Sequence, residues 1–206
     1  MVTALGRLTL SEYLNYENGT DTLYELVNGE LIPMSLGSGL HSDLAEFLHD
    51  EFRVEIKQVG LPWTAKQMTV GIQSPQRGRW DTCRIPDVTV LPIEQWQQLR
   101  SKQEAIITLN EPPPLLVVEV VSKSTKIVDY RAKRSEYTVL GIPEYWIVDP
   151  LAGKITICEL IKGFYDTTEF SALDEIRSPT FKELRLTVAE EGRRQEAEGR
   201  RLQGNE

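Results

Sequence analysis

The sequence has few cysteines and histidines, two of each, and no hydrophobic run of the length that a membrane helix requires. Cys83 and Cys158 lie far apart in strand-like segments, which argues against a disulfide framework and predicts two buried thiols. This supply of nitrogen and sulfur ligands is also too small for an ordinary zinc site, which takes three or four of them. Without an apolar run of about 18 residues, no helix is expected to span a bilayer.

Positive charge and aromatic residues are scarce as well. The formal net charge of −8 argues against a protein whose whole surface binds nucleic acid, because phosphate contacts need clustered lysine and arginine. Aromatic residues make up 8% of the chain, which disfavours a glycosidase, because such an enzyme holds paired carboxylates in an aromatic-lined cleft. Residues 1–10 lack a basic region followed by an apolar stretch, so we expect a cytosolic protein.

The composition that remains is that of a globular domain, with 40% hydrophobic and 26% charged residues. A chain of 206 residues fits one domain with a short appendage, which we place at residues 1–185 and 186–206. In the appendage the sequence EGRR at 191–194 recurs seven residues later. Few apolar residues accompany this period, so a charged, solvated helical tail is preferred over a coiled coil, and no chemistry is assigned to it.

Hydrophobic periodicity predicts an α/β fold. Asn28-Gly29 lies between two short alternating runs and predicts a hairpin over residues 24–34. The continuous apolar run 115–121 predicts a strand buried on both faces at the centre of the sheet, and the helix and strand that follow it predict a parallel crossover. The other expected elements are a helix at 42–59, strands at 63–72 and 84–91 forming a second hairpin through 73–79, a loop or short helix at 93–103, a helix at 125–140, and strands at 144–148 and 154–160.

Two acidic residues interrupt strand-like runs, and they are the strongest sign of chemistry in the sequence. Glu119 lies in the middle of the most apolar run, where an isolated carboxylate must be protonated, paired with a cation or bound to metal. Strand alternation places it on the face of Val117 and Val121. Asp87 interrupts a second strand-like run, although aspartate disfavours strands.

Two carboxylates on neighbouring strands, with the backbone carbonyl of Val120 and some waters, would provide the oxygen ligands that Mg²⁺ or Mn²⁺ prefers. Such a site suits phosphodiester hydrolysis, because the metal polarises the phosphate and lowers the pKa of a bound water. Basic runs flank both acids, although such runs are as often merely solvated faces. They comprise Lys123, Lys126, Arg131, Lys133 and Arg134 after Glu119, and Arg77, Arg79 and Arg84 before Asp87.

Four ordered segments form a longer pattern that extends over roughly residues 10 to 190. They are YELVNGE at 24–30, IPDV at 85–88, LVVEVVS at 116–122 and GIPEYWIVDP at 141–150, with Asp129, Lys133 and Tyr137 between the last two. These motifs resemble the Uma-two family of restriction-endonuclease-like proteins. The resemblance implies a central mixed β-sheet flanked by helices, and a Mg²⁺- or Mn²⁺-dependent endonuclease that hydrolyses DNA with Asp87 and Glu119 as its main metal ligands.

One position departs from the pattern of the wider nuclease superfamily. Two residues after the glutamate, where that superfamily usually has a lysine, this chain has Val121. The resemblance implies that the lysine has moved to the following helix, where Lys133 is the matching residue. Asp129 would lie on the same helix face and could hold the ammonium in place. Lys123 and Lys126 remain competitors, because they are nearer the end of the strand.

Three further residues are weaker candidates. Glu30 resembles the acidic residue that many such nucleases supply from an N-terminal element as an additional metal or supporting ligand, although a glutamate just after an Asn-Gly turn is usually exposed. His41 either contacts the site or only begins the first long helix, and the second interpretation is preferred. Tyr137 either reaches the site with its hydroxyl or, in the preferred interpretation, packs on the sheet.

A second hypothesis is that the nuclease fold no longer cuts and serves as a binding or interaction module, which Val121 and the acidic net charge favour. Under the first hypothesis DNA is the substrate, and a two-fold homodimer would be the simplest way to cut both strands. The bases that would be recognised depend on loops that contact the DNA grooves, and no sequence feature identifies them.

Overall fold

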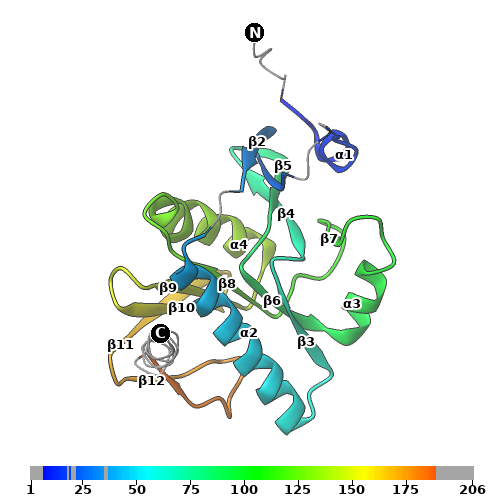
Figure 1. Ribbon diagram of the computed structural model, residues 1–206. Coiled ribbons are helices and arrows are strands. Elements are labelled where there is room, and N and C mark those ends of the chain that lie inside the picture. Colours follow the sequence, from blue (N-terminus) through cyan, green and yellow to red (C-terminus); the bar gives the residue numbers. More distant parts are fainter. Residues whose placement is uncertain (1–6, 18, 20–21, 35–36, 189–206) are drawn as a thin grey trace, which may run out of the picture.

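The structure is a computed structural model that describes residues 7–17, 19, 22–34 and 37–188 (Figure 1). In chain order its elements are α1 (Leu10–Leu14), β1 (Tyr24–Val27), β2 (Glu30–Pro33), α2 (Gly39–Val59), β3 (Trp63–Gln67), β4 (Gly71–Gln76), β5 (Arg79–Arg84), β6 (Val88–Pro92), α3 (Ile93–Leu99), β7 (Ile106–Ile107), β8 (Leu116–Val120), the π-helical turn η1 (Val128–Lys133), α4 (Arg134–Leu140), β9 (Glu144–Asp149), β10 (Lys154–Ile161), β11 (Phe164–Ser171), β12 (Glu175–Ile176) and β13 (Leu186–Thr187).

The largest sheet in the described part of the chain has six strands in the order β11-β10-β9-β8-β6-β3. Strands β8 and β9 are parallel, and the other neighbouring pairs are antiparallel, so the sheet is mixed. Strand β8 lies between β9 and β6, and η1 and α4 form the crossover to β9. The expected mixed sheet, its central strand and its parallel crossover are therefore confirmed.

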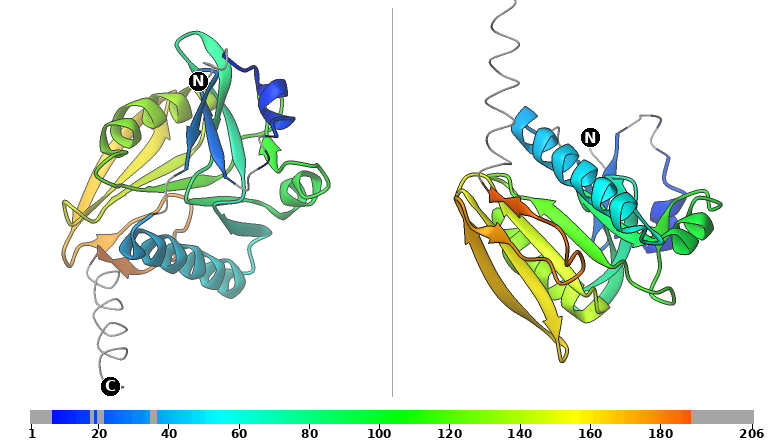
Figure 2. Two further views of the ribbon diagram at one scale, coloured as in Figure 1. Left: turned by 45° about the horizontal axis from the view of Figure 1, so that its top comes forward. Right: turned by 90° about the horizontal axis from the view of Figure 1, so that it is seen from below.

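Helix α2 covers one face of this sheet, as Figure 2 shows from two sides. Its buried residues Leu48 and Phe52 belong to the same core cluster as Val118 and Val120 of β8. The helix begins after Ser38, whose hydroxyl accepts a hydrogen bond from the backbone of His41, and it ends at Gly60, which has a left-handed φ of 75°. The expected helix is thus confirmed, and it begins three residues earlier than predicted.

The opposite face of β8 packs against α4. Val117 and Val121 share a second core cluster with Tyr137 of α4 and with Tyr145 of β9. This alternation along β8 confirms that Glu119, which lies between the two valines, faces the α4 side of the sheet.

A second sheet has the strand order β2-β1-β5-β4-β7. Its β1–β2 hairpin turns at Asn28 and Gly29, which have φ values of 51° and 84°, as the Asn-Gly dipeptide predicts. The β4–β5 hairpin turns at Arg77 and Gly78, which also have positive φ.

The expected strands 63–72 and 84–91 are wrong in their extent, because each is divided between the two sheets. Met68 adopts a left-handed φ of 46°, which ends β3 before β4 begins. The segment 85–87 separates β5 from β6, and Pro86 has no backbone N–H for a sheet ladder. Asp87 therefore does not interrupt a strand but lies just before β6. Strand β11, which pairs with β10, was not among the expected elements.

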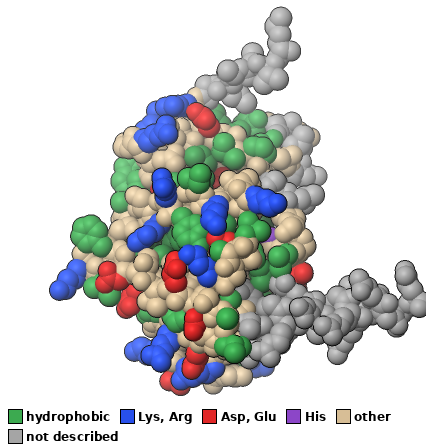
Figure 3. All heavy atoms as spheres, turned by 90° about the vertical axis from the view of Figure 1, so that its left-hand side faces the viewer, with side chains coloured by type: hydrophobic (Ala, Val, Ile, Leu, Met, Phe, Trp, Pro, Cys, Tyr) green, Lys and Arg blue, Asp and Glu red, His purple; other side chains and the backbone are tan. Residues whose placement is uncertain are grey.

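The C-terminal end of the described chain forms a short pair of strands. Leu186 and Thr187 pair with β12, whereas residues 189–206, with both EGRR copies, lie outside the described residues. Cys83 and Cys158 are buried free thiols, as expected. No helix among the described residues has the length and apolar character to cross a membrane. On the side that carries α4 and β11, Lys and Arg side chains stand around a hydrophobic patch (Figure 3).

Candidate active site

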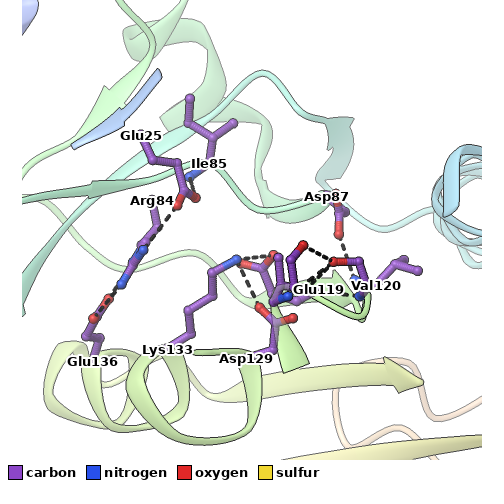
Figure 4. A network of polar contacts seen from close by, with 12 residues as sticks. Glu25, Arg84, Ile85, Asp87, Glu119, Val120, Asp129, Lys133 and Glu136 are labelled. Atoms are coloured by element: carbon purple, nitrogen blue, oxygen red, sulfur yellow. Dashed lines mark hydrogen bonds and ion pairs between the residues drawn. The ribbon is translucent and has the colours of Figure 1, made fainter. Parts of the chain in front are cut away.

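Asp87 and Glu119 are brought together by the pairing of β6 with β8. In that antiparallel ladder Val88 is the partner of Val118, so the next position places Asp87 opposite Glu119. The backbone N–H of Val120 donates to Oδ2 of Asp87 over 2.7 Å, which ties the carboxylate to β8. Directly opposite side chains in such a pair have Cβ atoms about 5 Å apart. The two acids therefore share one site, which Figure 4 shows from close by.

The other oxygen of Asp87 is held by His41. Nε2 of His41 lies 2.9 Å from Oδ1 of Asp87, and both side chains are largely buried. The hydrogen bond to Asp87 raises the pKa of His41 above 6.5, although burial of the imidazole opposes this. Both interpretations of His41 are therefore met. It lies in the first turn of α2, and it also contacts a predicted site residue.

Glu119 is held from the helix above it. Lys133 Nζ donates to Oε2 of Glu119 over 2.7 Å, and the hydroxyl of Tyr137 donates to Oε1, also over 2.7 Å. Tyr137 is fully buried in the core cluster beneath α4. Its ring therefore packs on the sheet while its hydroxyl reaches the predicted site, so the two interpretations of this residue are both met.

Glu119 and Lys133 each shift the pKa of the other. Burial raises the pKa of Glu119 to about 8, and the neighbouring Asp87 adds to this, whereas Lys133 opposes it. Burial lowers the pKa of Lys133, but its attraction to Glu119 and to other nearby acids is larger, so the net shift is upward from 10.5. Lys133 therefore keeps its proton at neutral pH, whereas burial favours the protonated form of Glu119 up to a pH of about 8.

Asp129 completes the contacts of Lys133. Its Oδ1 lies 3.2 Å from Nζ of Lys133, and both residues belong to the π-helical turn η1. Asp129 is buried, and this burial raises the pKa of its carboxyl group. Of the competing lysines, Lys126 pairs with Asp149 at 2.9 Å and Lys123 is exposed. Of the three candidate lysines, the structure thus brings Lys133 to Glu119.

Glu30 is not joined to this cluster in the described part of the chain. Its side chain is 64% exposed and lies 3.8 Å from Arg7. Glu25, earlier in the same motif, is nearer the cluster, because its charge raises the pKa of both Glu119 and Lys133. Glu25 was not among the site residues that the sequence predicted, although it interrupts strand β1 much as Glu119 interrupts β8.

The donor set fits a hard divalent cation. Among the described residues, no group of three or more His, Cys, Asp and Glu side chains is arranged to hold a metal ion. Asp87 and Glu119 nevertheless offer two carboxylates, and the carbonyl of Val120 lies on the same edge of β8 as the N–H that contacts Asp87. Mg²⁺ is commonly held by one or two carboxylates and keeps several waters. Glu119, whose pKa burial raises to about 8, would release its proton on binding such an ion.

Comparisons with known proteins agree with this architecture. A solved structure described as a putative nuclease belonging to DUF820, from Anabaena variabilis, is similar to this chain with a TM-score of 0.69 and 17% sequence identity. The similarity covers 89% of this chain and 97% of that one, and it shows a shared fold. No curated protein matches the sequence. The family Uma2, described as "Putative restriction endonuclease", matches residues 10–189, a range that contains every residue of the cluster. The chain therefore belongs to the Uma2 family and has the restriction-endonuclease-like fold that its motifs predict.

Proposed function

We propose that this protein is a metal-dependent endonuclease that hydrolyses phosphodiester bonds in DNA. The observation that carries the proposal is the meeting of Asp87, Glu119 and Lys133 at one buried point, with 2.7 Å between Glu119 and the lysine. Two carboxylates and an ammonium group are the side chains that such hydrolysis needs, and the description of the family is in accord with this chemistry.

Each residue of the cluster has a role that follows from its contacts. Asp87, Glu119 and the Val120 carbonyl would hold Mg²⁺ or Mn²⁺. The bound ion supplies polarisation of the scissile phosphate and a water of lowered pKa. The Lys133 ammonium would orient the attacking water or offset negative charge on the phosphate, because it keeps its proton.

The remaining contacts position these groups. Tyr137 donates to one oxygen of Glu119, which fixes the orientation of that carboxylate. His41 and the Val120 N–H do the same for Asp87. Asp129 limits how far the Lys133 ammonium can move, because its carboxylate lies 3.2 Å from Nζ. Groups held in this way need little rearrangement during reaction.

Exposed cations near the cluster offer contacts for DNA phosphates despite the net charge of −8. Lys123 and Arg131 are exposed on the segment that links β8 to α4, and Lys126, also exposed, is paired with Asp149. Figure 3 shows the side of the molecule that carries α4, with Lys and Arg side chains on it among Asp and Glu side chains. Arg84, which the sequence placed in a second basic run, is buried and paired with Glu136, so it is not available to a phosphate. We therefore propose that DNA approaches the α4 side.

A plasmid-nicking assay tests the proposal. We expect the wild type to nick supercoiled plasmid with Mg²⁺ or Mn²⁺ and to stop when the metal is chelated. Asp87→Asn, Glu119→Gln and Lys133→Met should each lose activity by about 100-fold or more. Circular dichroism should confirm that each variant is folded.

Two matched controls separate loss of the site from loss of stability. Glu144→Gln changes another buried carboxylate, which accepts hydrogen bonds from Ser178 and Thr180, and should retain nicking. Lys102→Met removes another lysine that is paired with a carboxylate, that of Glu111, and should also retain it. A wild type that never nicks DNA with any divalent ion would refute the proposal and favour the binding-module hypothesis.

A further inference from the structure

A buried guanidinium connects the five-stranded sheet to helix α4 beside the cluster. Arg84 ends β5 in the five-stranded sheet and is 2% exposed. Its Nε and one terminal nitrogen donate to the two oxygens of Glu136 on α4, over 2.8 and 2.9 Å. Its other terminal nitrogen donates to Glu25 on β1 over 3.1 Å. Figure 4 shows these three residues, here termed the Arg84 clasp, in a line next to the cluster.

One end of the clasp reaches the helix that carries the lysine. Glu136 lies one turn after Lys133 and directly before Tyr137, and those two residues hold Glu119. Two parallel hydrogen bonds to a planar guanidinium fix both the position and the direction of a carboxylate. The rotation of the helix about its axis, and with it the position of the Lys133 ammonium, is therefore tied to Arg84.

The other end reaches the segment that carries Asp87. Glu25 Oε1 accepts a hydrogen bond from the backbone N–H of Ile85 over 3.1 Å, and Ile85 is two residues before Asp87. In this segment, between β5 and β6, the backbone carbonyl of Asp87 accepts from the N–H of Met68 over 3.0 Å, and Glu25 holds the other end at Ile85. Arg84 thus contacts, through one carboxylate each, the two parts of the chain that supply Lys133 and Asp87.

A contribution to the stability of the fold does not by itself explain this network of buried charges. A buried ion pair can often be replaced by apolar side chains of similar size without loss of stability, because both charges must be removed from water. Glu136 also accepts hydrogen bonds from Ser74 and Gln76 of β4, each over 3.0 Å, so five polar side chains are arranged around one contact between the five-stranded sheet and α4. A network of directional hydrogen bonds of this kind fixes the relative positions of the groups that it joins.

We propose that Arg84 is a positioning residue, which sets the placement of Lys133 relative to Asp87 by clasping Glu136 with one side of its guanidinium and Glu25 with the other. The effect of Arg84 on catalysis rests on the proposed function. Its effect on the position of Lys133 does not, because that position can be measured in a protein that cuts nothing.

Lysine NMR on the full-length protein tests the geometric part. The Nζ resonance of Lys133 is assigned by its absence in Lys133→Met and compared between the wild type, Arg84→Met, Glu136→Leu and the double variant. Each single variant removes one partner of the buried Arg84–Glu136 pair and should unfold at lower urea concentration. The double variant should recover part of that loss, because this pair is then removed whole and only Glu25, which still accepts from the Ile85 N–H, has lost a partner. The Lys133 resonance should nevertheless remain shifted in all three.

A conservative variant and a control complete the design. Arg84→Lys keeps the charge but cannot make the two parallel bonds, and it should also shift the Lys133 resonance. Glu144→Gln removes a buried carboxylate elsewhere and should leave that resonance in place. If the wild type nicks DNA, Arg84→Lys should lower kcat by about 10- to 100-fold with little change in KM.

An unchanged Lys133 resonance in the double variant or in Arg84→Lys would overturn the proposal, and Arg84→Lys decides the matter if the double variant does not fold. Absence of nicking by the wild type would count against the proposed function alone, since the NMR and urea measurements still report on the clasp.

Discussion

The ammonium of Lys133 lies 2.7 Å from the carboxylate of Glu119, although the two residues are 14 positions apart in the sequence. The strand supplies no lysine here, because Val121 stands at the position where the wider superfamily usually has one and is part of the apolar core beneath α4. The positive charge beside Glu119 comes from the helix that follows. Both charged side chains are at most 7% exposed, so neither can turn to water if the other is removed. Several measurable properties of the protein follow from this mutual dependence.

Lys133→Met should destabilise the metal-free protein by about 3–5 kcal/mol, because it leaves Glu119 buried without a cation. Urea denaturation followed by circular dichroism measures the change. Lys102→Met serves as the matched control and should cost about 1 kcal/mol or less, since Lys102 and Glu111 form a partly exposed pair. A Lys133→Met protein as stable as the control would contradict the importance of the buried pair.

Tyr137→Phe should destabilise the protein by about 1.5–3 kcal/mol above pH 8, where Glu119 is charged, because the lost hydroxyl donates to a buried oxygen of this carboxylate. Tyr165→Phe is the comparison, since the Tyr165 hydroxyl donates to a neutral backbone carbonyl, that of Ile142. Its loss should cost about 0.5–1.5 kcal/mol. Equal effects in the two variants would show that the charge of Glu119 adds nothing to the bond.

Metal affinity should increase with pH up to about 8, the value to which burial raises the pKa of Glu119. A metal ligand must be deprotonated, so below that pH each added pH unit should strengthen binding by up to about tenfold, and above it the affinity should level off. Calorimetric titration with Mn²⁺ at several pH values measures this dependence. Glu119→Gln should abolish the dependence, and an affinity that is independent of pH in the wild type would contradict the assignment.

The contact between His41 and Asp87 should make stability depend on pH in the opposite direction. Asp87 raises the folded-state pKa of His41 above 6.5, so protonated His41 is favoured in the folded protein. The stabilisation is fully present below pH 6.5 and is lost as the pH rises through the folded-state pKa.

The free energy of unfolding of the wild type, compared with that of His41→Gln, measures this effect in the absence of metal. The advantage of the wild type should shrink as the pH rises. His49→Gln, on the same helix, provides the control. A wild-type advantage that stays constant with pH would refute the coupling between His41 and Asp87.

The sequence predicted those parts of the site that depend on local patterns. The face of Glu119 follows from strand alternation in a continuous apolar run, and the β1–β2 turn follows from the positive φ that Asn28 and Gly29 readily adopt. Lys133 was identified through the resemblance, because its distance to Glu119 depends on how a helix packs over the sheet. Local pattern alone did not distinguish it from Lys123 or Lys126.

What the sequence did not predict depends on contacts between distant segments. The division of 63–72 between two sheets depends on a left-handed Met68, which has no strong residue signal. Glu25 and Arg84 are brought together by the pairing of β1 with β5, which local periodicity cannot reveal. The π-helical turn η1 is likewise invisible in a pattern that repeats every three to four residues.

That wider turn has a consequence for how the protein tolerates change in length. A π-helical turn holds about one residue more than the α-helical turn that it replaces, so removing one residue from η1 and closing it to α-helical pitch would largely keep the rotation of the chain before it relative to the chain after it. The change would fall inside the turn, where Asp129 and Lys133 would come to lie three positions apart and not four. Deletion of the exposed Arg131 should therefore disturb the 3.2 Å contact between Asp129 and Lys133 more than its replacement by alanine, because only the deletion changes the spacing of these two residues.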